Sequence, residues 1–478
     1  MRLANHSCVL LGSVLFAGHA LAQTAPASLD HPWHSAAEQT LQRDAAQMRP
    51  TEFAVDPSTT YTLAQLIDLA EAHNPETRAA WERARQQAAA LGIARAELFP
   101  TLAASALALT NRDEVYLATR FYRQTSQSFD LALDLNYTLF DFGARSGRIG
   151  AARAQLLAAN FAFNDVHRRL IYQVASAYYQ LLNAAGLEEA ARANLANAQA
   201  VEQAAEASLR NGLATLPDVL EARSEAAQAD YDLQAALGAE DVAHGNLTTA
   251  LGASPVSAIR VEPLDQIATP EAIEGTVEEA IDRAIRQRPD LMRQVAAIRE
   301  ADARLRQAHA AYFPRLTVDA RPNAQSLYAM QQTLPWGHTA DLDGGITFGL
   351  NWTVFDGGAR KNQLAQAQAD VQATTAQAHA LRDRIENGIW TAYSNLKTAF
   401  RQRQAAQALL DAASKSYDAA IESYHYGVRN LLDVTEAQRT LARARYADVQ
   451  ARTQVLNALA DLAFETADTI QPAPAGKP

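Results

Sequence analysis

The 478-residue chain contains a single cysteine, Cys8. It lies by a short apolar stretch, residues 9–17, which follows Arg2 and precedes Ala20-Leu21-Ala22. A positive start, a short apolar run and a small-x-small site are typical of a secretory signal, which we assign to residues 1–22. The run is too short for a transmembrane anchor. Once Cys8 leaves with the signal, the mature chain has no disulfide, no thiol chemistry and no acylation site, so we predict an envelope protein.

Long apolar runs and an excess of positive charge are also missing. No later segment has the roughly 20 continuous apolar residues of a membrane helix, so a membrane crossing would have to use β-strands. The net charge of −11 and the pI near 5.5 argue against nucleic acid as a partner, because nucleic acid selects basic surfaces.

Catalytic and cofactor motifs are absent as well. The sequence has no nucleophile elbow, no HExxH and no phosphate-binding loop. His31 and His34 flank Pro32-Trp33, and surface positions suit them better than a metal site. We therefore predict no enzyme activity, no cofactor and no dedicated metal site.

Proline is missing from two long stretches, residues 144–211 and 359–426. Each can form a nearly continuous helix, about 100 Å long at 1.5 Å per residue. In the second stretch apolar residues recur every seven positions, the coiled-coil period: Leu364, Val371, Ala378, Ile385, Ala392 and Ala399. The many alanines favour a wall of closely packed helices. A soluble coiled-coil spacer would show the same period and stays an alternative here.

The sequence contains an internal repeat. Phe99-Pro100 returns as Phe313-Pro314, LNYTLFDFGAR from Leu135 returns as LNWTVFDGGAR from Leu350, and Asp218-Val219 returns as Asp433-Val434. Shifts of 214 or 215 residues over most of the chain indicate two copies of one structural unit. We assign residues 61–252 and 275–467 to the copies and 253–274 to a linker. Residues 23–60 form an N-terminal segment, and 468–478 form a proline-rich tail.

Each copy also contains an alternating segment. In the first copy, apolar residues from Phe129 to Leu139 alternate with polar or small ones, and the second copy repeats this from Ile346 to Val354. Such alternation is typical of a membrane β-barrel strand, although a single strand of this kind also suits an amphipathic sheet on a soluble core. We expect partner strands to begin at Thr101 and Leu316, with long polar loops at residues 111–127 and 323–341.

Four strands per chain are too few for a closed barrel, which needs about eight or more, and open edges are not tolerated in lipid. The sequence therefore predicts an oligomer, and three copies would give twelve strands. Tyr137 and Trp352 hold equivalent positions, where we expect an interfacial aromatic girdle.

Each long helix is expected to turn back and form a hairpin with a second helix. Gly212 and Gly427 suit the end of the first helix, and Pro217 suits the first turn of the returning helix. Asp433 and Glu436 are three residues apart, so they share one helix face. In a threefold assembly this face would place six carboxylates around one opening, where multivalent cations could bind. Two acids near a helix start also have a simpler use as partners of the helix dipole.

Two Phe-Pro breaks, the LFDFGAR and VFDGGAR turns, and hairpins with a G-x-x-x-L-x-D-V-x-E-A tip resemble the TolC family of outer-membrane efflux proteins. The resemblance covers residues 61–467. It implies a mixed α and β membrane protein: a homotrimer with a twelve-stranded barrel in the outer membrane and a twelve-helix tunnel through the periplasm. A collar would surround the tunnel, with residues 23–60 near it. The implied partners are an inner-membrane ABC or proton-driven transporter and a periplasmic adaptor.

The resemblance also assigns roles at the hairpin tips. It places the periplasmic constriction at Asp433 and Glu436, and it links neighbouring coiled coils through Asp218, Tyr424 and Arg429. Pro217 departs from the family pattern, in which a hydrogen-bonding residue is common, so one gate contact is in doubt.

Three functions remain open at this point. The chain has no L-x-G-C lipidation site, which many drug-efflux members carry. We therefore expect the channel of a type I secretion system that exports a protein toxin of the haemolysin or cyclolysin kind. A multidrug efflux channel is the first alternative, and a periplasmic coiled-coil adaptor without a pore is the second. Adaptors usually have one hairpin and an inner-membrane anchor, whereas this chain has two hairpins and no anchor.

Overall fold

The computed structural model describes residues 30, 34, 38–47, 55–117, 119–268, 270, 275–332 and 334–468. The predicted signal, residues 1–22, lies outside this part of the chain. The chain forms two units, residues 1–53 and 54–478. In the first unit, helix α1 (Glu38–Gln47) has no buried residue. The placement of residues 23–60 near a collar stays a prediction.

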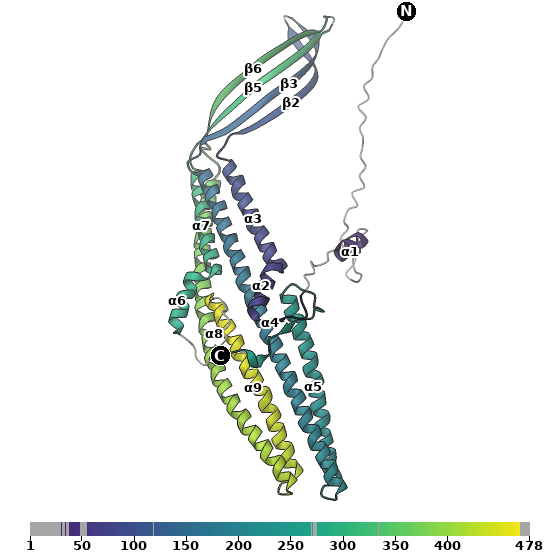
Figure 1. The fold of residues 1–478 in the computed structure, drawn as a ribbon. Coiled ribbons are helices and arrows are strands. Elements are labelled where there is room, and N and C mark those ends of the chain that lie inside the picture. The colour runs from purple at the N-terminus through teal and green to yellow at the C-terminus, as the bar shows by residue number, and fades with distance from the viewer. Residues whose placement is uncertain are drawn as a thin grey trace, which may run out of the picture. The chain divides into compact units, whose positions relative to one another are not determined.

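One four-stranded sheet stands at one end of the second unit (Figure 1). Its strands are β2 (Thr101–Leu117), β3 (Arg120–Phe140), β5 (Arg315–Gln331) and β6 (Gly337–Asn351). All neighbours are antiparallel, in the order β2-β3-β5-β6. Strands β2 and β6 therefore form its two edges.

The predicted loops at residues 111–127 and 323–341 are wrong. Strands β2 and β3 stay paired up to Leu117 opposite Arg120, and β5 and β6 stay paired up to Ala329 opposite Gly337. Polarity in these segments excludes burial in a core, but it does not prevent backbone pairing. Val115, Tyr122 and Thr125 also favour strands there.

The two faces of the sheet differ in the way the alternation predicts. Phe129, Leu131 and Phe348 are more than half exposed on one face, and Phe348 exposes 70 % of its surface. On the other face Ala132 is buried and Asp130 is half-buried. Tyr137 lies within β3, whereas Trp352 lies just beyond the end of β6, so the two equivalent aromatics differ in secondary structure. Their role in a girdle stays a prediction.

Each long helix begins at the repeated Asp-x-Gly-x-Arg turn that follows its strand, with Ala144 as the first residue of α4 and Ala359 as the first residue of α8. The Asp141 carboxylate accepts hydrogen bonds from the backbone N–H groups of Gly143 (3.3 Å) and Arg145 (2.8 Å). Asp356 does the same for Gly358 (3.1 Å) and Arg360 (3.0 Å). Both Gly143 (φ +101°) and Gly358 (φ +90°) adopt a left-handed conformation that favours glycine. The motif thus converts a strand into a helix.

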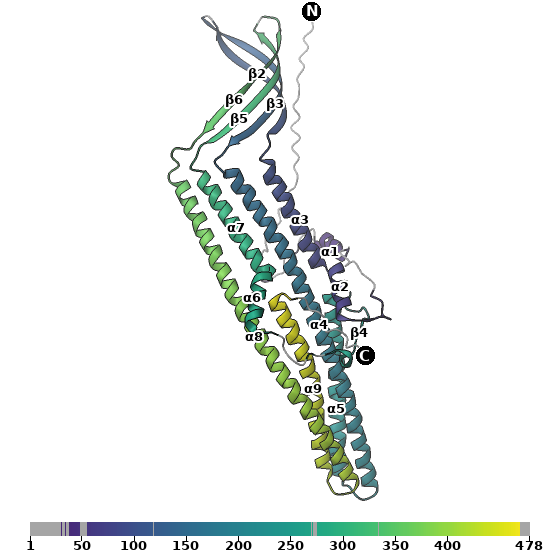
Figure 2. The same ribbon diagram turned by 60° about the vertical axis from the view of Figure 1, so that its left-hand side comes forward.

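The helices beside the sheet form a row. They are α3 (Pro75–Ala96), α4 (Ala144–Arg210), α7 (Pro289–Ala310) and α8 (Ala359–His425). Helix α8 packs on α7, α7 on α4, and α4 on α3 (Figure 2). Helices α4 and α8 are 67 residues long each. In the described part of the chain, no helix is long and apolar enough to span a membrane.

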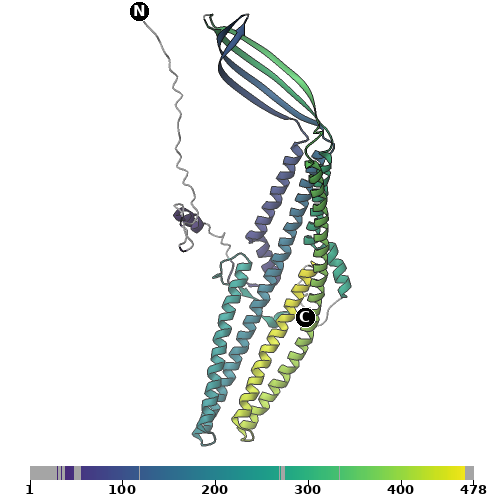
Figure 3. The same ribbon diagram turned by 180° about the vertical axis from the view of Figure 1, so that it is seen from behind.

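Two helical hairpins extend away from the sheet. Helix α4 pairs with α5 (Leu216–Ala250), and α8 pairs with α9 (Leu431–Thr466) (Figure 3). The seven-residue period fits the packing of α8. Residues buried at this spacing are Ile385, Ala392, Ala399, Ala406, Ala413 and Ala420. Leu364, Val371 and Ala378, earlier in the predicted seam, are half-buried.

Short elements complete the second unit at the middle of the long helices. They are β1 (Thr60–Tyr61), α2 (Leu63–His73), β4 (Arg260–Val261), the 3-10 helix η1 (Leu264–Gln266) and α6 (Val277–Gln287). Strands β1 and β4 pair in parallel, which joins the start of the first copy to the linker at residues 253–274.

Candidate functional site: the hairpin tips

The tips of the two hairpins lie at the end of the second unit that is far from the sheet (Figure 1). Gly212 (φ +72°) and Gly427 (φ +71°) directly follow the ends of α4 and α8 in left-handed conformations, which suit glycine. Thr215 and Asn430 cap the returning helices, and Pro217 lies in the first turn of α5. Gly212, Gly427 and Pro217 thus lie at the turns between the paired helices.

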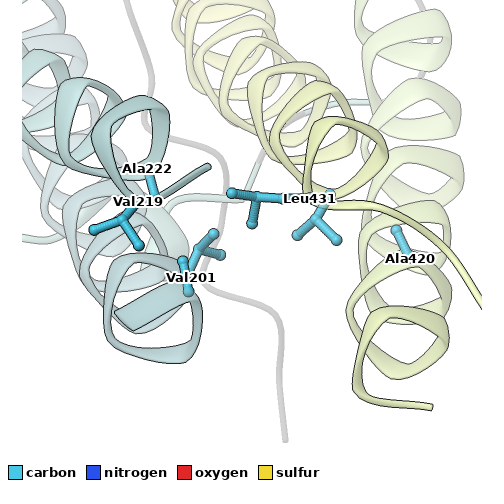
Figure 4. Close-up of a cluster of buried hydrophobic side chains, with 7 residues drawn as sticks. Val201, Val219, Ala222, Ala420 and Leu431 are labelled. Atoms are coloured by element: carbon cyan, nitrogen blue, oxygen red, sulfur yellow. The ribbon is translucent and has the colours of Figure 1, made fainter. Parts of the chain in front are cut away.

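A small apolar core holds the two tips together. It contains residues of all four hairpin helices: Val201, Ala205, Val219, Ala222, Ala420, Leu431 and Val434 (Figure 4). Burial of this cluster joins the α4–α5 hairpin to the α8–α9 hairpin within one chain, because apolar area is removed from water at the contact. The tip is therefore a packed, four-helix structure on which polar side chains are displayed.

Asp433 and Glu436 are both exposed on the first turns of α9. The Asp433 backbone N–H donates to Asn430 Oδ1 (2.9 Å), but its carboxylate has no partner in the described residues. The Glu436 side chain is 62 % exposed, and its Oε2 lies 3.9 Å from Arg439 Nη1. Both acids share one helix face, as predicted, and Asp433 is the less neutralised of the two.

Asp218 is the repeat equivalent of Asp433, but its carboxylate is occupied. It accepts hydrogen bonds from the Thr215 backbone N–H (2.8 Å) and hydroxyl (2.7 Å). These bonds hold the pKa of Asp218 below its usual value. At the corresponding position of the second tip, Asn430 has no hydroxyl, and its side chain accepts a hydrogen bond from the Asp433 backbone N–H (2.9 Å). The Asp433 carboxylate accepts no hydrogen bond from the described residues, so it is available to another partner.

Asp218, Tyr424 and Arg429 do not contact one another within the described chain. The Tyr424 hydroxyl donates to Ser208 Oγ at 3.5 Å, which is an intrachain contact between α8 and α4. Arg429 is exposed, and its guanidinium has no hydrogen bond or ion pair in the part of the chain that is described. A gate made from these three residues therefore requires contacts between chains and stays a prediction.

Arg439 is a tip residue that the sequence analysis missed. From α9 it reaches across to α5, where it binds Glu221 (2.9 Å) and Glu225. These carboxylates raise the pKa of Arg439 further above its usual value. The repeat gave no signal, since the equivalent residue is Ser224. Three glutamates around one arginine become visible only when the two hairpins are brought together.

A second missed feature is a buried ion network at the middle of the long helices. Arg288 binds Asp290 (2.7 Å) and Glu465 (2.5 Å), and Arg168 binds Asp165 (2.8 Å) and lies 3.5 Å from Asp290. Arg288 and Arg168 also donate to the backbone oxygens of Glu465 and Phe464 (2.8 and 2.7 Å). The network thus caps the end of α9 and ties it to α4 and α7.

The described residues contain no group of three or more His, Cys, Asp or Glu side chains arranged to hold a metal ion. The tip offers carboxylates, a phenol and the Arg429 guanidinium, which has no partner among the described residues. Its chemistry is suited to the attraction and exclusion of ions and to reversible contacts between helices.

A model of the family described as outer membrane efflux protein matches residues 66–253 and 280–466, once in each copy of the repeat. The chain belongs to this family. Its members are export channels of the outer membrane that reach into the periplasm, and they are not enzymes. The resemblance to the TolC family is thereby confirmed, and the adaptor alternative loses its support.

Two relatives illustrate the similarity. Protein CyaE of Bordetella pertussis is 29 % identical over 403 residues, covering 83 % of both chains. Pyoverdine export outer membrane protein OpmQ of Pseudomonas aeruginosa is 28 % identical over 413 residues, again covering 83 % of both.

Solved structures share the fold. A membrane protein from Pseudomonas aeruginosa gives a TM-score of 0.76 at 24 % identity, covering 88 % of this chain and 99 % of that one. The outer membrane protein VceC of Vibrio cholerae gives 0.72 at 20 % identity, covering 86 % and 97 %.

Proposed function

We propose that three copies of this efflux-family chain assemble into one channel, with a closed twelve-stranded barrel above a twelve-helix tunnel. The observation that carries this proposal is the sheet with two free edges, β2 and β6, and one exposed apolar face. Unpaired backbone groups cost several kcal/mol each in lipid, so these edges need partners. Three sheets of four strands give twelve, within the range of closed membrane barrels.

The channel would export substrates that it receives from an inner-membrane transporter through a periplasmic adaptor. We infer a type I secretion role, in which the cargo is a protein toxin. The support is the sequence itself, since Cys8 is the only cysteine and no lipid-attachment motif follows it.

Export of small molecules is the second candidate, and the names of relatives favour it. OpmQ is named for pyoverdine export, and the Pseudomonas putida relatives ArpC and SrpC are named for antibiotic and solvent efflux. Protein-toxin export and small-molecule export can use the same channel wall. The difference between them would therefore lie in which transporter and adaptor bind the periplasmic end.

At the tip, we propose that Asp433 and Glu436 of three chains form a cation-selective ring. Carboxylates confined at a narrow opening reinforce one another's field. Asp433 would contribute more than Glu436, because Arg439 lies beside Glu436 and offsets part of its charge. Arg429, whose guanidinium has no partner among the described residues, would bind a carboxylate of a neighbouring chain and hold the tip closed.

The secretion role is tested in cells that lack their own channel of this family. The chain is produced with a type I transporter, its adaptor and an RTX-type cargo, and secreted cargo is measured in the medium. A parallel strain carries a drug-efflux transporter and adaptor, and drug resistance is measured. Secretion without restored resistance supports the toxin role, whereas restored resistance without secretion supports the small-molecule alternative.

A further inference from the structure

The internal repeat makes the two edge strands, β2 and β6, equivalent to the two central strands, β5 and β3, which pair within the chain. Helix α7 and strand β5 repeat α3 and β2 with a shift of 214, as Phe99-Pro100 and Phe313-Pro314 show. Helix α8 and strand β6 repeat α4 and β3 with a shift of 215, as Gly143 and Gly358 show. Within the chain, the two copies meet where β3 pairs with β5 and α4 packs on α7. The equivalent contact joins β6 with β2 and α8 with α3, and it can form only between two chains.

The two shifts reproduce the observed strand register. In the first hairpin, Thr101 lies opposite Asn136. Adding 214 and 215 to these positions gives Arg315 and Asn351, and these two residues do lie opposite each other in the second hairpin. The repeat therefore preserves the pairing to the residue, which permits its use for the remaining edge.

We propose that β6 of one chain pairs with β2 of the next copy in a defined register, with Thr347 opposite Leu109 of the partner subunit. The equivalent pair within the chain is Ala132 opposite Asn323. This inference rests on the proposed assembly of several copies and adds its register. The polar faces agree with this register, because Asn351 and Thr347 then lie opposite Ser105 and Leu109 of the partner subunit, on the face of β2 that lies opposite Ala132 and Ser128 of β3.

The packing of the helices supports the same contact between chains, with α8 of one chain against α3 of the next. Within the chain α4 and α7 approach closely at Gly147, where an added Cβ would lie 2.9 Å from Ala303 O. Gln155 Nε2 donates to Glu300 Oε1 across this contact at 2.8 Å. The repeat equivalents are Asp370 on α8 and Gln86 on α3, so donor and acceptor are exchanged but the pair is kept.

Among the described residues, nothing covers the outer faces of α3 and α8. Gln86 and Asp370 are exposed, whereas their equivalents Glu300 and Gln155 are half-buried. Ile93 exposes 75 % of its surface, and its equivalent Gln307 packs against Gly147. Gly147 itself becomes Asn362 in the second copy, so the helices between subunits must lie somewhat farther apart at this level. A second copy therefore has matching faces on both layers.

The register also fixes the stagger of the sheet. Residues that lie directly opposite one another on the four neighbouring strands of one chain form a row, for example Ser105, Ala132, Asn323 and Asp343. The next member is Asp113 of the partner subunit, so each subunit advances the register by eight residues (113 − 105). With rises near 3.3 Å and spacings near 4.8 Å, the strands would tilt about 54° from the barrel axis, which is steeper than the roughly 35–45° of typical barrels. Asp343 and Asp113 form a like-charge pair on the polar face, where water screens it.

Engineered disulfides test the register, because Cys8, the one native cysteine, lies in the predicted signal and leaves the mature chain without a competing thiol. Thr347→Cys is combined in turn with Leu107→Cys, Leu109→Cys and Asn111→Cys. A shift of two residues adds about 6.8 Å along the strand. This exceeds what a disulfide tolerates, since its Cα atoms lie roughly 4.4–6.8 Å apart. We expect covalent dimers and trimers with Leu109→Cys and little cross-linking with the other two.

The matched control is the intrachain pair Ala132→Cys with Asn323→Cys, which has the same place in the repeat and should oxidise without joining chains. On the helices, Asp370→Cys with Gln86→Cys should cross-link chains, and Asp370→Cys with Glu82→Cys, one turn away, should not.

Native mass of the same preparations separates the possible failures. An intact oligomer that cross-links best through Leu107→Cys or Asn111→Cys, or through none of the three, overturns the register and leaves the proposed channel standing. A single chain mass overturns the register and the proposed assembly together.

Discussion

Replacement of Arg288 by methionine should destabilise the middle of the channel more than any exposed ion pair nearby. Arg288 is buried, and it joins Asp290, Glu465 and a backbone carbonyl at the end of α9. Arg288→Met keeps a long side chain but leaves two carboxylates and one carbonyl without this partner. Removal of one member of a buried pair costs about 3–5 kcal/mol.

The lower end of this range, about 3 kcal/mol per chain, is expected here. Arg168 lies 3.5 Å from Asp290 and retains part of the compensation. The matched control is Arg283→Ala, which removes an ion pair to Asp468 (2.8 Å) with both side chains over a third exposed. A pair of that kind contributes only about 0–1 kcal/mol.

The pH dependence has a defined sign. Burial alone would raise the pKa of Asp290, but the hydrogen bonds and charge of Arg288, with Arg168 nearby, lower it below the ordinary value of 3.8. A lowered folded-state pKa stabilises the fold above the unfolded-state pKa, and this stabilisation is lost as pH falls through the folded-state value. Acid destabilisation below about pH 4 should therefore be smaller in Asp290→Asn than in the wild type.

Thermal unfolding of detergent-purified protein, followed by tryptophan fluorescence between pH 2 and 7, measures both effects. Arg288→Met should unfold at a clearly lower temperature than Arg283→Ala at pH 7. Equal unfolding temperatures for the two variants would refute the assignment of the buried network as the anchor of α9.

Two further predictions concern the tip. Asp433→Ala should lower the cation preference of the channel in reversal-potential measurements more than Glu436→Ala does, because Arg439 already offsets Glu436, and the double variant should lose block by trivalent cations. Equal selectivity of the double variant and the wild type would mean that both acids are only solvated helix-face residues. Arg429→Ala should raise single-channel conductance in a planar bilayer without loss of helix content, since its guanidinium has no partner within the described part of the chain. An unchanged conductance in an intact oligomer would assign closure to other contacts.

The long helices and the turns between elements were accessible from the sequence because local chemistry specifies them. Absence of proline over residues 144–211 and 359–426 allowed two helices, and both form nearly to the predicted ends. The Asp-x-Gly-x-Arg turn carries its own hydrogen bonds, so its repetition marks the same structure twice.

The strand ends were not accessible in the same way. A membrane-type alternation appears only where one face is apolar, and the β2–β3 hairpin continues beyond that zone with polar residues on both faces. Backbone pairing and strand-favouring residues such as Val115 and Tyr122 extend it, and the pairing itself has no signature in side-chain polarity. The predicted loops failed for this reason.

The site was predicted in part. Sequence spacing put Asp433 and Glu436 on one face, and the repeat pointed to Asp218 as an equivalent acid. The bridge from Arg439 to α5 and the network around Arg288 depend on residues brought together from different copies of the repeat. Partners separated by more than 170 residues leave no local pattern. The use of Asp218 as a cap is local, because its partner Thr215 lies three residues earlier, but the sequence analysis assigned Asp218 to the gate instead.

The most direct test of the central claim is the native mass of the protein extracted from outer membranes in detergent. The four-stranded sheet with two free edges predicts a species of three mature chains. A monodisperse single chain that retains its full β-structure would contradict the channel.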